Sequence, residues 1–117
     1  MIEVALVILA TALPGQCDQL DKSRFTPREV RCVIRRVWEP TLVADATRVA
    51  NCESRLNPLA YNSGSGASGL YQFLPSTWRR SWNPHRRQSP FNAVANVRAA
   101  RVLFKLYGNW SQWSCRP

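Results

Sequence analysis

Four cysteines constrain the fold of this chain more than any other feature: Cys17, Cys32, Cys52 and Cys115. They form an even set without a Cys-x-x-Cys pair, and His85 is the one histidine, so disulfides are favoured over a zinc site. Four cysteines allow three pairings, and four reduced thiols in a cytosolic protein are the alternative. We favour the pairs Cys17–Cys32 and Cys52–Cys115. The second closes a long loop, worth about 4 kcal/mol in chain entropy.

The first residues carry an apolar run, Val4 to Leu13, that is too short to span a bilayer but suits the core of a signal peptide. Ala10-Thr11-Ala12 offers a small-x-small cleavage site. The residues before the run include Glu3 and no Lys or Arg, so an apolar segment packed on the domain is the alternative. We therefore assign residues 1–16 to a signal peptide or apolar N-terminal segment. We therefore expect a protein that is secreted or located in the cell wall, without a stable membrane span.

Apolar residues recur at helical spacing in two segments between about residues 26 and 56. Thr26-Pro27-Arg28-Glu29 is a capping box with proline at the first helical position, and it predicts a helix to about Trp38. A second helix is expected from Pro40 or Thr41 to about Leu56, because the residue after Leu56 precedes a proline.

The rest of the chain predicts a Gly/Ser-rich loop and two more helices. A brief helix is expected at Pro75 to Trp78, and a last long helix, capped by Ser89-Pro90, should end at Gly108. No internal repeat or second domain is visible. We expect an N-terminal helical extension over residues 17–40 and one domain over residues 41–117. The fold class is mainly α, with little or no sheet, stapled by disulfides and monomeric.

Glu53 is placed unusually for an acid. No Asp or Glu follows it, against nine Arg and Lys in the same span. It falls on the apolar stripe of the second helix, where desolvation favours a neutral carboxyl group that can act as a general acid. Glycosidic bond cleavage is the reaction that most often uses such a general acid. Asp45 lies about 12 Å away by helical rise, too far for a retaining nucleophile, so a single-acid mechanism is predicted. A buried glutamate paired with an arginine is the alternative.

The net charge of +9 and the pI near 10.5 predict attraction to polyanions. The basic, Trp-rich segment Trp78 to Trp82 could stack on nucleic acid. Because an exported, disulfide-bonded protein meets the cell wall, we expect anionic cell-wall polymers as possible partners and no nucleic acid. Gly64 to Gly69 spells G-x-G-x-x-G, but no apolar strand precedes it and no acid follows it, so a dinucleotide site is not indicated. Neither a cofactor nor a metal is expected.

The motifs around Glu53 resemble those of the soluble lytic transglycosylases. They are Glu53-Ser54, Asn57-Pro58, Ala60, Gly66-Ala67-Ser68-Gly69-Leu70-Tyr71-Gln72 and Pro75-Ser76-Thr77-Trp78. The fuller pattern is similar to the transglycosylase-like domain of the resuscitation-promoting factor group. There a Cys-Glu-Ser start and a Trp-x-x-Trp-x-Cys end, here Cys52-Glu53-Ser54 and Trp110 to Cys115, are joined by a disulfide. The resemblance covers about residues 41–117.

The resemblance implies a small lysozyme-like fold that cleaves the MurNAc-GlcNAc bond of peptidoglycan. Glu53 would protonate the leaving oxygen and then, as a carboxylate, help the muramoyl 6-hydroxyl attack, which leaves a 1,6-anhydro end. By motif position the implied substrate-binding residues are Asn62, Tyr71, Gln72 and Thr77. Asn62 matches a polar residue beside the acid, and Tyr71 and Gln72 match a cleft-lining Met-Gln pair.

One departure from the soluble lytic transglycosylases concerns their late Ala-Tyr-Asn-Ala-Gly motif, which is absent here. Tyr107, followed by Gly108, would supply the equivalent phenol. Two alternatives therefore stay open. One is a muramidase that hydrolyses the same bond, and the other is a wall-binding or resuscitation-type module that does not rely on turnover.

Overall fold

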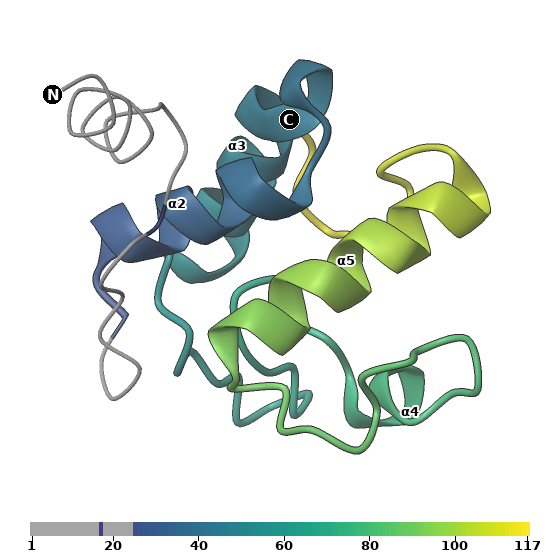
Figure 1. Cartoon of the computed structure of the whole chain (residues 1–117). Coiled ribbons are helices and arrows are strands. Elements are labelled where there is room, and N and C mark those ends of the chain that lie inside the picture. The colour runs from purple at the N-terminus through teal and green to yellow at the C-terminus, as the bar shows by residue number, and fades with distance from the viewer. Residues whose placement is uncertain (1–16, 18–24) are drawn as a thin grey trace, which may run out of the picture.

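The computed structural model describes Cys17 and residues 25–117, which are mainly helical (Figure 1). The described elements are α2 (Pro27–Val37), the 3-10 turn η1 (Pro40–Leu42), α3 (Val43–Ser54), α4 (Pro75–Trp78) and α5 (Ala93–Tyr107). Extended pairing within this part consists of two isolated antiparallel bridges, Tyr61 with Ser68 and Ser68 with Phe73. The mainly α fold with little or no sheet is therefore confirmed. The signal-peptide prediction for residues 1–16 lies outside the described residues.

Helix α2 begins where the capping box predicts. Thr26 Oγ1 accepts from the Glu29 amide (3.2 Å), and Glu29 Oε1 accepts from the Thr26 amide (3.0 Å). Val30 and Ile34 on its apolar face are fully buried, and the helix packs against both α3 and α5. In Figure 1, α2 and α5 lie toward the viewer, with α3 behind α2 and α4 below α5. The helix expected within an N-terminal extension thus shares one core with the rest of the described chain.

Helix α3 ends at Ser54, two residues before the predicted end. Arg55 and Leu56 both adopt the left-handed conformation, with φ of 55° and 59°, and this breaks the helical hydrogen bonds. Leu56 is nonetheless buried, so its side chain anchors the turn in the core. Burial of this side chain stabilises a backbone conformation that is otherwise unfavourable.

Helix α5 begins later than predicted, because Ser89-Pro90 does not cap it. Asn92 is the N-cap, and its Oδ1 accepts from the Ala95 amide (3.0 Å). Ser89 instead uses its hydroxyl to accept from the Phe91 amide, which forms a separate turn (3.1 Å). The predicted end is confirmed: Gly108 closes the helix with φ of 73°. None of the helices described for this chain is long and apolar enough to cross a membrane.

Both favoured disulfides are present. Cys17 is bonded to Cys32 on α2, and Cys52 in the last turn of α3 is bonded to Cys115 near the C-terminus. The Cα–Cα distances are 5.6 and 6.0 Å, within the ordinary range for disulfides. The second bond brings the C-terminal segment back onto α3.

An aromatic cluster fixes the same C-terminal segment from the other side. Trp110 packs on Trp38 with ring centroids 5.2 Å apart, and Trp113 packs on Trp110 at the same spacing. All three indoles are buried. Arg116 Nη1 donates to the carbonyl oxygens of Trp110 and Trp113. The segment after α5 is thus part of the core, which positions Cys115 beside α3.

Candidate active site

Glu53 lies in the last turn of α3, half-buried, against the C-terminal segment. Its Oε2 accepts a hydrogen bond from the backbone amide of Cys115 (3.0 Å). The preceding residue, Cys52, is covalently bonded to the same Cys115. The carboxylate is therefore held both through its own backbone and through one oxygen atom, which leaves Oε1 without a hydrogen bond from any described residue.

No lysine or arginine of the described chain pairs with Glu53. Ion pairs instead join Arg48 to Asp45 (2.9 Å) and join both Arg101 and Lys105 to Glu39 (2.5 and 3.6 Å). The alternative of a glutamate neutralised by an arginine is thus not seen among residues 25–117. Within the same part, no three His, Cys, Asp or Glu side chains gather as metal ligands.

The position of Glu53 differs from the expected core-facing one. Ala46 and Val49, on the same stripe, are fully buried, whereas Glu53 lies at the rim. The left-handed turn at Arg55 and Leu56 ends α3 directly after Ser54, so Glu53 lies where the apolar stripe reaches the edge of the core. A half-exposed carboxyl group can reach a bound polymer, which a fully buried one cannot.

Gln72 is connected to the end of α3 by a series of hydrogen bonds. Ser54 O accepts from Asn57 N, and Asn57 O accepts from Ala60 N. Ala60 O in turn accepts from Gln72 Nε2 (3.1 Å), which also donates to Gly69 O (3.0 Å). The carboxamide oxygen of Gln72 accepts no hydrogen bond from the described residues. The segment after Glu53 and the Gly/Ser-rich loop therefore form one hydrogen-bonded unit.

Backbone strain concentrates in this unit. The described non-glycine residues with positive φ are Arg55, Leu56 and Gln72, the last at 49°. Such conformations are unfavourable for residues with a side chain and occur most often at functional sites. All three lie between Glu53 and α4, so the strain supports this region as the candidate site.

Asn96 on α5 holds the loop in place, and the sequence reasoning missed it. It is fully buried; its Oδ1 accepts from the Tyr71 amide (2.9 Å) and its Nδ2 donates to Pro90 O (2.8 Å). Gly69 packs directly against it, and a Cβ there would lie 2.3 Å from Pro90 O. The available signal was an amide at i+3 from Ala93, on the apolar stripe of the last helix.

The sequence-predicted substrate-binding residues occupy different environments. Asn62 is exposed, and its Oδ1 accepts from the amides of Gly64 (2.9 Å) and Ser65 (3.3 Å). Thr77 on α4 is half-buried, and Tyr107 at the end of α5 is exposed. Neither the Thr77 nor the Tyr107 side chain hydrogen-bonds to Glu53 or Gln72 in the part of the chain described.

Tyr71, by contrast, is a core residue. Its side chain is fully buried, and its hydroxyl donates to Ala46 O (2.9 Å) on α3. Burial raises the pKa of this phenol far above its ordinary value, and the Trp38 indole opposes the shift only in part. The ring thus supports the helix that carries Glu53 and has no exposed surface for a ligand.

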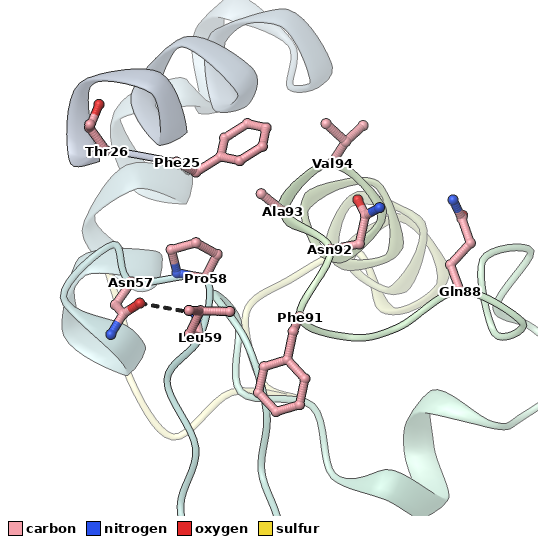
Figure 2. Close-up of a pocket in the computed structure, with 10 residues that line it drawn as sticks. All are labelled: Phe25, Thr26, Asn57, Pro58, Leu59, Gln88, Phe91, Asn92, Ala93 and Val94. Atoms are coloured by element: carbon pink, nitrogen blue, oxygen red, sulfur yellow. Dashed lines mark hydrogen bonds between the residues drawn. The ribbon is translucent and has the colours of Figure 1, made fainter. Parts of the chain in front are cut away.

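A hollow between three helical segments does not contain Glu53. It measures about 700 Å³ and lies between the start of α2, the turn after α3 and the start of α5 (Figure 2). Its walls are Phe25, Thr26, Asn57, Pro58, Leu59, Gln88, Phe91, Asn92, Ala93 and Val94. No titratable side chain lines it. The candidate site is therefore assigned by its carboxylate and hydrogen bonds rather than by the size of a cavity.

Comparison with known protein families agrees with this region. A family model described as the transglycosylase SLT domain matches residues 34–115, from the last turn of α2 to the cysteine that contacts Glu53. No curated protein and no solved structure matches the chain significantly.

Proposed function

The chain belongs to the transglycosylase SLT family, and from this premise we propose that it cleaves the MurNAc-GlcNAc bond of peptidoglycan as a lytic transglycosylase. The family indicates activity of the lytic transglycosylase type on peptidoglycan, and the helical, disulfide-stapled fold is of the lysozyme-like kind. The observation that carries the proposal is Glu53: the last acid of the chain, unpaired by any described cation and held by the Cys115 amide.

The hydrogen bond to Oε2 assigns separate tasks to the two carboxyl oxygens. An oxygen that accepts from an amide N–H is not the one that carries the acidic proton, so Oε1 carries it. From Oε1 the proton passes to the glycosidic oxygen as the bond to the sugar carbon breaks. The Cys115 amide then stabilises the carboxylate that this transfer leaves.

The second half of the reaction uses the substrate's own hydroxyl group. The Glu53 carboxylate takes the proton from the muramoyl 6-hydroxyl while the oxygen of that hydroxyl bonds to the anomeric carbon. The product is a 1,6-anhydro end. Because this nucleophile belongs to the substrate, no second carboxylate and no water is needed. Asp45 is paired with Arg48 two turns earlier on α3 and takes no part.

Four other residues are proposed to bind the glycan. Gln72 is the best supported, because its amide nitrogen is fixed by two carbonyl groups and its carboxamide oxygen is unused by the described residues. Asn62, Thr77 and Tyr107 remain predictions from the motif resemblance. For Tyr71 we propose a positioning role through Ala46 instead of the substrate contact implied by its motif.

The test is mass spectrometry of soluble fragments released from purified peptidoglycan by the oxidised protein, Glu53→Gln and Asp45→Asn. We expect anhydro-muramoyl ends from the wild type and Asp45→Asn and none from Glu53→Gln. Reducing ends that disappear in Glu53→Gln would assign a muramidase instead. Wall binding without any released fragment would assign a binding module.

Export is the remaining part of the proposal. The family and the two disulfides are compatible with an extracytoplasmic location. We propose that residues 1–16 direct secretion. The test is to measure the mass of the protein recovered from the medium or cell wall of an expressing host. Protein that stays in the cytoplasm with an intact N-terminus would contradict the proposal.

A further inference from the structure

A second hollow lies between α2 and α5, away from Glu53. It measures about 440 Å³ and is lined by Val33, Arg36, Val37, Val94, Arg98 and Arg101. Three of these residues come from each helix, at spacings that place them on one face. Val94 also lines the larger hollow, so the two hollows are neighbours along α5. None of the residues proposed for catalysis lines either of them.

The charges in this α2–α5 groove are unbalanced. Arg36 and Arg98 are exposed, and neither side chain makes a hydrogen bond or ion pair with a described residue. Arg101 is fixed, because its Nε and Nη2 both donate to Glu39 Oε1 (3.0 and 2.5 Å). Glu39 also has Lys105 at 3.6 Å, so its charge is already compensated. Two guanidinium groups on facing helices remain uncompensated.

The chemistry of the lining suits a phosphodiester. Guanidinium groups donate two parallel hydrogen bonds to phosphate oxygens, and the pairing is stronger beside apolar surface, which three valines supply here. The adjoining hollow offers the carboxamide nitrogens of Asn57, Gln88 and Asn92, whose oxygens already have partners in the chain. These nitrogens can donate to polyol hydroxyls. Phosphates at one end and hydroxyls at the other describe a polyol-phosphate chain.

We propose that the α2–α5 groove binds the phosphodiester groups of an anionic polyol-phosphate polymer of the cell wall, through Arg36 and Arg98. Binding there retains the protein on the wall while Glu53 acts on glycan elsewhere. The choice of a wall polymer rests on the proposed function, whereas the affinity for phosphodiesters rests on the arginines themselves.

The experiment is titration of the oxidised protein with soluble poly(glycerol phosphate) by calorimetry at several salt concentrations. The test variant is Arg36→Gln with Arg98→Gln. The matched control is Arg79→Gln with Arg80→Gln, which removes the same charge from two exposed arginines after α4. We expect the groove variant to bind roughly tenfold more weakly with a shallower salt slope, and the control to keep most of its affinity. Equal losses in both would overturn the proposal in favour of a diffuse electrostatic field.

Two further measurements separate the possible failures. Single-stranded DNA that binds as tightly through the same two arginines would overturn the assignment to a wall polymer. Digestion of polymer-free peptidoglycan should be the same for the groove variant and the wild type, and its loss in the groove variant would place the arginines in the catalytic machinery. Arginine-dependent polymer binding without glycan cleavage by the wild type would uphold phosphodiester binding and reject the proposed activity alone.

Discussion

The backbone amide of Cys115 donates a hydrogen bond to Oε2 of Glu53, 62 residues earlier in the chain, and the Cys115 sulfur is bonded to Cys52, the residue before Glu53. One C-terminal residue therefore orients the candidate catalytic carboxylate twice. A disulfide in this place does more than restrict the unfolded chain, because it also keeps the Cys115 amide beside Glu53, where that amide occupies one carboxyl oxygen. The relationship explains why the segment after α5 belongs to the site.

Replacing Cys52 and Cys115 together by alanine should lower both stability and activity. The bond spans 63 residues, and its loss should lower the free energy of unfolding by about 4 kcal/mol in the chain-entropy model. Misorientation of Glu53 should lower kcat by about tenfold or more, assayed at a temperature where circular dichroism shows a folded chain. The control, Cys17→Ala with Cys32→Ala, opens a 15-residue span worth about 3 kcal/mol and should keep kcat. Equal kcat for the two double variants would contradict the orienting role.

Gly69→Ala should destabilise the protein far more than Gly108→Ala. Both glycines have positive φ, 80° and 73°, so alanine carries a backbone penalty of about 1 kcal/mol at each. At Gly69 the added Cβ also meets Pro90 O at 2.3 Å and Asn96 Nδ2 at 2.4 Å, whereas at Gly108 no atom lies within 4 Å. We expect losses of about 3 kcal/mol or more and about 1 kcal/mol in urea denaturation. Similar losses would show that the loop moves away from α5 at little cost.

The thermal stability should fall in acid partly through Glu39. The side-chain hydrogen bond from Arg101 holds the pKa of Glu39 below its ordinary value of 4.5. The folded state therefore binds this proton less readily than the unfolded state, and the stabilisation is present above pH 4.5 and lost as pH falls through the folded pKa. Glu39→Gln should lower Tm at pH 7, and its difference from the wild type should shrink toward pH 3. A difference that stays constant from pH 7 to pH 3 would contradict this.

Tyr71→Phe should affect stability and leave substrate binding unchanged. It removes the hydrogen bond from the phenol to Ala46 O, which should lower the free energy of unfolding by about 1 kcal/mol. KM for peptidoglycan should stay the same, because the ring is fully buried. Gln72→Ala should instead raise KM if its carboxamide contacts the glycan. A raised KM in Tyr71→Phe at unchanged stability would restore the substrate contact that its motif implies.

Several features were predictable because their causes are local in the chain. The capping box at Thr26 and Glu29 and the left-handed glycine at Gly108 depend on residues a few positions apart, and both stand where the sequence indicates. Local signals also compete: Ser89-Pro90 and Asn92 are both plausible helix caps, and α5 uses the second. The favoured disulfide pairs, the mainly α fold and the candidate acid Glu53 all came from cysteine spacing, apolar periodicity or motif resemblance.

Only the tertiary structure decided the contacts between residues that are far apart in the sequence. Helical spacing predicts that Glu53 faces the core, but the turn at Arg55 and Leu56 and the returning C-terminal segment determine its half-exposed position and its amide partner. Tyr71 occupies a cleft position in its motif, yet the space between α3 and α5 buries it, and Asn96 fixes its backbone. The physical reason is that burial and hydrogen-bond partners depend on which elements pack together, whereas the sequence pattern determines only the elements themselves.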